Sequence, residues 1–136
     1  MKFKMVHNNF NVADLEKSMK FYAEAFDLHE VKRIAPEDGS FIIVYLANSE
    51  SSHRLELTWV KEMEGAYNLG DNEFHLAFET DDYESAHALH EKMGCICYEN
   101  TEVRIFTDEY REVRKIIAAV RRIRAVEVFS TGAVDL

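Results

Sequence analysis

The stretch His7-Asn8-Asn9-Phe10-Asn11-Val12-Ala13-Asp14 carries the pattern on which the fold prediction rests. A histidine on a strand-like segment is followed, seven residues later, by an aspartate suited to cap a helix. The same spacing returns 68 residues further on, where His75 precedes Asp82. A repeat of one supersecondary unit at a fixed offset indicates two related modules.

The first module is predicted to have the order βαβββ. Asp14 begins a helix that runs to about Phe26, because apolar residues recur along it at helical spacing. The residues on that face are Leu15, Met19, Tyr22 and Phe26. The strands predicted around the helix, separated by turn-forming clusters, are Phe3–His7, Glu30–Ile34, Phe41–Ala47 and His53–Val60.

The second module repeats this start. Asp82 caps a helix that ends at Gly94, and the offset aligns Leu89 with the core position Phe21. An amphipathic pattern between Glu109 and Arg124 also predicts an additional helix at about 108–124. The predicted strands are Glu73–Glu79, Cys95–Tyr98, Val103–Thr107 and Ala125–Phe129.

These elements predict an α+β fold of paired βαβββ modules. We expect a single domain over residues 1–136, with module 1 at about 1–62 and module 2 at about 72–136. Cys95 and Cys97 are expected to be buried and inert, since their spacing suits neither a disulfide nor a zinc cluster.

The net charge of −9 disfavours nucleic acid as a partner, because phosphate binding needs a basic surface. No apolar run approaches the ~20 residues that a membrane helix needs, so no membrane partner is expected. The apolar part of the N-terminus is too short for a signal peptide, and a cytoplasmic location is expected by default.

The repeat also predicts a metal site on the polar face of the sheet. Imidazole and carboxylate are the ligands of a divalent ion that acts as a Lewis acid. His7 and His75 occupy equivalent strands, and Glu56 alternates with the apolar residues of its own strand. Glu127 repeats the apolar–Glu–apolar pattern in the last strand, displaced by three residues from the offset, and is the best fourth ligand.

Each of these residues has an ordinary alternative. A single strand histidine or glutamate is usually solvated or ion-paired, and it is their symmetric placement that favours a shared site. The other histidines are expected to be structural or exposed, namely His29, His53, His87 and His90. The sequence contains no glycine-rich phosphate loop and no nucleophile elbow.

Three stretches resemble the vicinal oxygen chelate superfamily, and glyoxalase I (lactoylglutathione lyase) within it. They are His7–Tyr22, Leu55-Glu56-Leu57-Thr58 and Asn68–Phe78. The resemblance implies a curved mixed sheet around a metal site. It also implies a homodimer that binds Ni²⁺ or Zn²⁺, with Co²⁺ possible, through two histidines and two glutamates. It also implies conversion of the hemithioacetal of methylglyoxal and glutathione to S-lactoylglutathione through a metal-stabilised enediolate. On this pattern Glu127 is the base and Glu56 the ligand opposite it.

The chain departs from that pattern in three places. Asn8 and Asn9 follow His7 where an arginine is common, and Val60 stands where an asparagine is expected for glutathione. The cosubstrate is therefore glutathione or another thiol. The helix predicted at about 108–124 replaces the closing hairpin of the family.

Two other functions are compatible with the same residues. A related epimerase or dioxygenase would use a His/His/Glu triad with iron or cobalt. A non-catalytic small-molecule binding protein of the same fold is the third possibility. Metal content and oxygen consumption separate these functions.

Overall fold

The computed structural model describes most of the first 96 residues and short strands beyond them. The described residues are 1–63, 65, 67–68, 76, 78–96, 116–117, 120–123 and 126–128, the last three ranges by backbone alone. The chain divides into two compact units. Unit 1 comprises Met1–Asn68 with Ile123–Val126, and unit 2 comprises Leu69–Arg122 with Glu127–Leu136.

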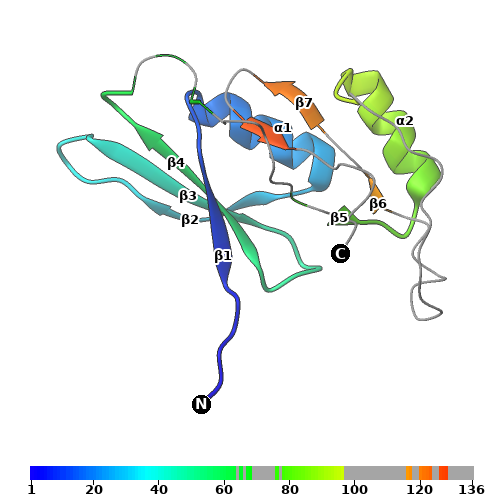
Figure 1. The fold of residues 1–136 in the computed structure, drawn as a ribbon, viewed down its shortest axis with the longest axis horizontal. Coiled ribbons are helices and arrows are strands. Elements are labelled where there is room, and N and C mark those ends of the chain that lie inside the picture. The colour runs from blue at the N-terminus through cyan, green and yellow to red at the C-terminus, as the bar shows by residue number, and fades with distance from the viewer. Residues whose placement is uncertain are drawn as a thin grey trace. The chain divides into compact units, whose positions relative to one another are not determined.

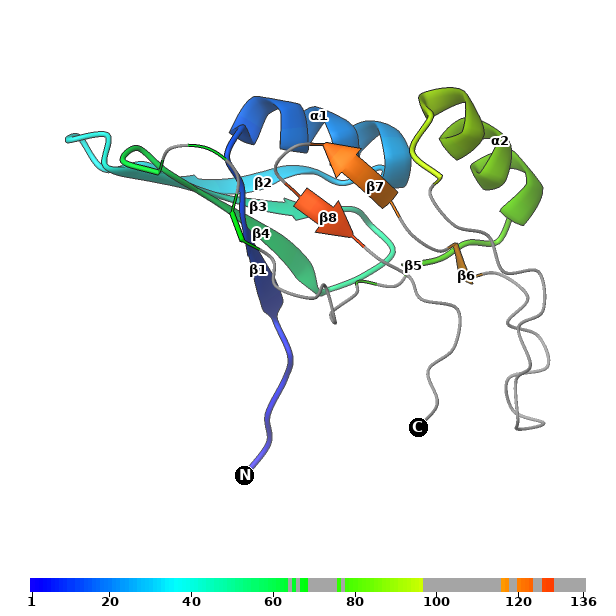
Figure 2. The ribbon, with the colours of Figure 1, turned by 45° about the horizontal axis from the view of Figure 1, so that its top comes forward.

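Unit 1 contains a four-stranded mixed sheet with one helix, α1, across one face (Figures 1 and 2). The strand order is β1-β4-β3-β2, in which β1 runs parallel to β4 and the other neighbours are antiparallel. The elements are β1 His7–Asn11, α1 Leu15–Phe26, β2 His29–Ile34, β3 Phe41–Ala47 and β4 Arg54–Val60. This is the βαβββ order predicted for the first module.

Local capping sets both ends of α1. The Asp14 carboxylate accepts a hydrogen bond from the backbone N–H of Lys17 at 3.0 Å, which satisfies one of the free donors of the first turn. Asp27 ends the helix in the left-handed conformation, with φ of 55°. The predicted helix from Asp14 to Phe26 is therefore confirmed.

The core of unit 1 lies between α1 and the sheet. Leu55 and Leu57 on β4 are buried, whereas Arg54, Glu56 and Thr58 alternate onto the other face. We call that second face, opposite α1, the open face. The buried apolar residues are Val12, Leu15, Phe21, Tyr22, Ala25, Leu28, Val44, Leu46, Leu55 and Leu57.

The first strand lies later in the chain than predicted. The alternation of Phe3–His7 predicted a strand there, but β1 begins at His7 and Phe3 is 90% exposed. Pairing decides this boundary, because β4 begins only at Arg54, whose N–H bonds to the carbonyl of Val6. Residues before Val6 have no β4 residue opposite them, so the prediction for residues 3–6 was wrong.

Unit 2 contains a helix and a two-stranded antiparallel ladder. The helix α2, Tyr83–Met93, begins at Asp82, whose carboxylate accepts the N–H of Ser85 at 3.0 Å. It ends at Gly94 with φ of 65°, as predicted. The ladder pairs β5 (Phe78–Glu79) with β6 (Ile116–Ile117).

Two details of unit 2 differ from the prediction. Leu89, aligned with the core residue Phe21, is 40% exposed, and its neighbour His90 is buried instead. In the strand predicted at Glu73–Glu79, Phe78–Glu79 is a strand and Leu76 is not, whereas residues 73–75 and 77 lie outside the described residues.

The predicted helix at about 108–124 is wrong where the structure describes it. Strands β6 and β7, the latter Val120–Ile123, occupy part of that range, and β7 pairs with β8, Val126–Val128. The apolar residues here are β-branched and favour a pleated strand over a helix. These residues are Ile116, Ile117, Val120 and Ile123. Residues 108–115 lie outside the described residues.

The described residues cover only part of the remaining strand predictions. The strand predicted at Ala125–Phe129 agrees with β8, whereas residues 97–107 lie outside the described part of the chain. Among the described residues, no helix combines the length and apolar character needed to cross a membrane.

Candidate metal centre

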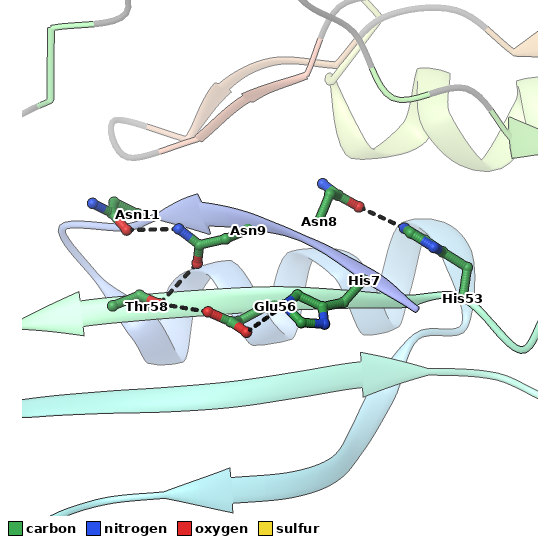
Figure 3. Close-up of polar contacts among 7 residues, drawn as sticks. All are labelled: His7, Asn8, Asn9, Asn11, His53, Glu56 and Thr58. Atoms are coloured by element: carbon green, nitrogen blue, oxygen red, sulfur yellow. Dashed lines mark hydrogen bonds and ion pairs between the residues drawn. The ribbon is translucent and has the colours of Figure 1, made fainter. Parts of the chain in front are cut away.

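The pairing of β1 with β4 brings His7 and Glu56 together on the open face of the sheet (Figure 3). Asn9 lies opposite Glu56 in the parallel register, and His7 precedes it by two residues on the same face. The imidazole Nε2 of His7 lies 3.3 Å from Oε2 of Glu56. Two residues 49 apart in the sequence therefore present adjacent nitrogen and oxygen donors.

Burial divides these two residues. The side chain of Glu56 is 12% exposed and that of His7 is 41% exposed. A carboxylate that is largely removed from water is costly unless a cation or hydrogen-bond donors compensate for its charge. Glu56 is therefore the member of the pair that is shielded from water, and His7 is the member that faces solvent.

Tyr45 on β3 is a further neighbour of the pair. Its ring meets the His7 ring edge to face, with centroids 5.5 Å apart, and its register partner is Glu56. A hydrogen bond to the Glu56 carboxylate, followed by desolvation and the carboxylate charge, raises the pKa of Tyr45. Lys32 Nζ lies 5.4 Å from the centre of the same ring. The Tyr45 hydroxyl thus stays protonated and can donate to Glu56.

A row of polar side chains continues from Glu56 along the two strands (Figure 3). Thr58 Oγ1 lies 3.3 Å from Glu56 Oε1 and 2.8 Å from Asn9 Oδ1. Asn9 Nδ2 in turn lies 2.9 Å from Asn11 Oδ1. This row was not predicted from the sequence. Its signal is the alternation of Asn9, Asn11 and Thr58 with apolar residues on two paired strands.

The donor geometry of the pair fits one divalent cation. Two donors bonded to one ion at about 2.1 Å lie about 3.0–3.4 Å apart for octahedral or tetrahedral angles. The 3.3 Å between His7 Nε2 and Glu56 Oε2 lies within that range. A neutral imidazole and a carboxylate are also the donor types that Zn²⁺, Ni²⁺ and Co²⁺ accept.

The two other predicted ligands are described less fully. Glu127 lies on β8, for which only the backbone is described, and His75 lies outside the described residues. In the part of the chain that is described, no group of three or more His, Cys, Asp or Glu side chains is placed to hold a metal ion. His7 and Glu56 are the predicted ligands that the structure brings together.

Three of the other histidines either contact a polar side chain or are buried. His53 Nε2 lies 2.9 Å from Asn8 Oδ1, exposed His29 lies 2.8 Å from Asp27 Oδ1, and His90 is buried. Cys95 is also buried, as predicted, with its Sγ 3.5 Å from the His90 carbonyl. Cys97 lies outside the described residues.

The sequence matches one known family. A profile of the "Glyoxalase/Bleomycin resistance protein/Dioxygenase superfamily" matches residues 4–97. The chain belongs to this superfamily. The predicted family and the α+β fold class are thereby confirmed.

Two of the relatives of this chain are lactoylglutathione lyases. The enzyme of Schizosaccharomyces pombe is 31% identical over 113 residues, which cover 68% of this chain and 37% of that enzyme. The chain thus matches little more than a third of the yeast protein. The enzyme of Neisseria meningitidis serogroup A is 29% identical over 101 residues, 71% of each chain.

A solved structure shows the same fold. The trypanothione-dependent glyoxalase I of Leishmania major superimposes with a TM-score of 0.69 at 21% identity. The superposition covers 93% of this chain and 84% of the Leishmania chain.

Proposed function

We propose that this chain is a metal-dependent, glyoxalase I-like lyase. Its substrate would be the hemithioacetal of methylglyoxal and a thiol, glutathione or another, and its product the lactoyl thioester. The observation that carries the proposal is the His7–Glu56 donor pair, 3.3 Å apart on the polar face of the sheet. The likeness to two lactoylglutathione lyases supports the choice of reaction.

The proposed ligand set is His7, Glu56, His75 and Glu127. These residues would hold a divalent ion, and the ion would supply the positive charge that stabilises an enediolate. Ni²⁺, Zn²⁺ and Co²⁺ all suit a set of imidazoles and carboxylates. We also propose that the protein is a homodimer and that it lies in the cytoplasm.

The protein's own side chains have separate roles in this proposal. Glu127 takes the proton from the substrate carbon that bears sulfur and returns it to the neighbouring carbon. Contacts with Thr58 and Tyr45 hold the Glu56 carboxylate in place. The Tyr45 ring packs edge to face against the His7 ring and limits its rotation.

The test measures bound metal and turnover in the same samples. Protein purified with added Ni²⁺ or Zn²⁺ is analysed by mass spectrometry for metal content and assayed with the hemithioacetals of glutathione and of a second thiol. We expect about one metal ion per subunit, and turnover that is lost in Glu127→Ala. Glu62→Ala, an exposed glutamate after β4, is the matched control and should retain both.

Two results would contradict the proposal. Protein that stays metal-free in excess Ni²⁺ and Zn²⁺ would favour a non-catalytic binding protein of the same fold. Full turnover in Glu127→Ala would remove that residue from the reaction.

A metal-dependent epimerase or dioxygenase is the second candidate. The His7–Glu56 pair with His75 would form the triad that such an enzyme needs, and the superfamily includes dioxygenases. Oxygen consumption by the iron-loaded protein, without hemithioacetal turnover, would favour this candidate.

A further inference from the structure

Glu56 uses its two oxygens for different neighbours. Oε2 faces the His7 imidazole at 3.3 Å, whereas Oε1 lies 3.3 Å from the hydroxyl of Thr58. If Oε2 binds a cation, the contact at Oε1 decides how firmly the carboxylate is oriented. Thr58 is therefore placed to orient the proposed ligand Glu56.

The Thr58 hydroxyl lies between two acceptors but carries one hydrogen. It lies 2.8 Å from Asn9 Oδ1 and 3.3 Å from Glu56 Oε1, and it can donate to only one of them. Donation to Asn9 would leave the Thr58 oxygen facing a carboxylate oxygen with no hydrogen between them. For an ionised Glu56 that arrangement is unfavourable.

Rotation of two amide groups removes this conflict. A turn of 180° about the last bond of Asn9 and of Asn11 exchanges the oxygen and nitrogen of each amide without moving the side chain. Asn11 Nδ2 then donates to Asn9, Asn9 Nδ2 donates to Thr58 Oγ1, and Thr58 is free to donate to Glu56. All three contacts can then be hydrogen bonds at the same time, and the last is strengthened by the charge of its acceptor.

The strand register explains why these residues meet. In the parallel pairing of β1 with β4, Asn9 lies opposite Glu56 and Asn11 lies opposite Thr58. The four side chains thus occupy two adjacent rows on the open face. Figure 3 shows the contacts as one continuous row from Asn11 through Asn9 and Thr58 to Glu56 and His7.

We propose that Asn11, Asn9 and Thr58 form a hydrogen-bonded relay that orients Glu56 for cation binding. Thr58 and Asn9 are positioning residues, because they act through Glu56. The relay rests on the proposed function in that its purpose is to hold a metal ligand. Its existence, however, can be tested in protein without metal.

The first experiment measures the affinity for Zn²⁺ or Ni²⁺ by calorimetry. Thr58→Val keeps the shape of the side chain and removes the hydroxyl, and it should weaken binding by about 10-fold or more, the usual effect of losing such an outer contact. Thr58→Ser keeps the hydroxyl and should stay close to the wild-type affinity. Ser52→Ala removes an exposed hydroxyl in the turn before β4 and is the control.

Asn9→Ala tests whether Asn9 donates a hydrogen bond to Thr58 or accepts one from it. If Asn9 donates to Thr58, its loss weakens metal binding, and it has no further effect in the Thr58→Val background. Tighter binding by Asn9→Ala would mean that Asn9 takes the proton away from Glu56. That result, or unchanged affinity in Thr58→Val, would overturn the proposal.

The second experiment needs no metal and separates failure of the relay from failure of the proposed function. The side-chain amide signals of Asn9 are followed by ¹H–¹⁵N NMR in metal-free protein with and without Glu56→Gln. In the presence of Thr58 the substitution should shift these signals, and in the Thr58→Val background it should not. If the Asn9 signals are unchanged in Glu56→Gln, the relay is ruled out, whether or not the wild-type protein binds metal.

Discussion

Asn8 and His53 form a 2.9 Å hydrogen bond that ties the start of β1 to the residue preceding β4. Asn8 follows His7, so its side chain points to the opposite face of β1. The same strand pair is thus held on one face by Asn8 and His53 while it presents His7 and Glu56 on the other. The half-buried pair links residues 45 apart and helps to set the register on which the donor pair depends.

Loss of this bond should reduce stability by a modest amount. In His53→Ala the half-buried Asn8 oxygen loses its partner, and we expect a decrease of about 1 kcal/mol in the free energy of unfolding. Urea denaturation of the two single variants and of Asn8→Ala/His53→Ala measures the coupling between them. His29→Ala, which removes an exposed local pair with Asp27, is the control and should change stability by less. Fully additive effects of Asn8→Ala and His53→Ala would contradict a direct interaction.

Replacement of Asp14, which caps α1, should lower stability only when its side-chain oxygen acceptor is lost. Asp14→Ala removes the acceptor for the Lys17 N–H and should cost about 1 kcal/mol, whereas Asp14→Asn should retain most of the stability. Denaturation by urea, followed by circular dichroism, measures both variants. Equal stability of Asp14→Ala and the wild type would mean that the cap contributes nothing.

Tyr22 should make the protein less stable in alkaline solution. Burial raises the pKa of its hydroxyl, and this buried atom has no hydrogen-bond partner among the described residues. The unfolded chain releases this proton above pH ~10 while the folded chain retains it, so the free energy of unfolding falls as pH rises beyond that value.

Tyr22→Phe is the variant that tests this pH dependence. It should have wild-type stability or slightly more at neutral pH, because no hydrogen bond to a described residue is lost. Between about pH 10 and 11.5 its stability should fall less steeply than that of the wild type. The pKa of Tyr45 is also raised, so part of the decline should persist. Parallel stability curves for the two proteins across this pH range would contradict the prediction.

Added metal should stabilise the folded chain through His7 and Glu56. A ligand that binds only the folded state adds about 2.7 kcal/mol at a free concentration of 100 times its Kd. We expect thermal unfolding in excess Ni²⁺ to shift upward for the wild type and for His29→Ala, and much less for His7→Ala. An equal shift in His7→Ala would place the bound metal elsewhere on the protein.

Local interactions are the reason that much of the fold could be predicted from the sequence. Asp14 and Asp82 bind N–H groups three residues away, and Gly94 adopts its left-handed conformation without help from distant residues. Such caps are present in the order of the residues alone. The alternation of Leu55, Glu56 and Leu57 similarly placed the glutamate on the polar face before any pairing was known.

The tertiary structure decided what depends on pairing between distant strands. Strand β1 begins at His7 because β4 offers partners only from Arg54 onward, although the alternating pattern begins at Phe3. Ile116 and Val120 lie on strands because their backbones pair with other segments, which an amphipathic pattern cannot reveal. The sequence by itself thus determined the kinds of donor at the candidate site. Only the parallel register of β1 and β4 set His7 3.3 Å from Glu56 and added Thr58 and Asn9, because hydrogen bonds between strands depend on which residues lie opposite one another.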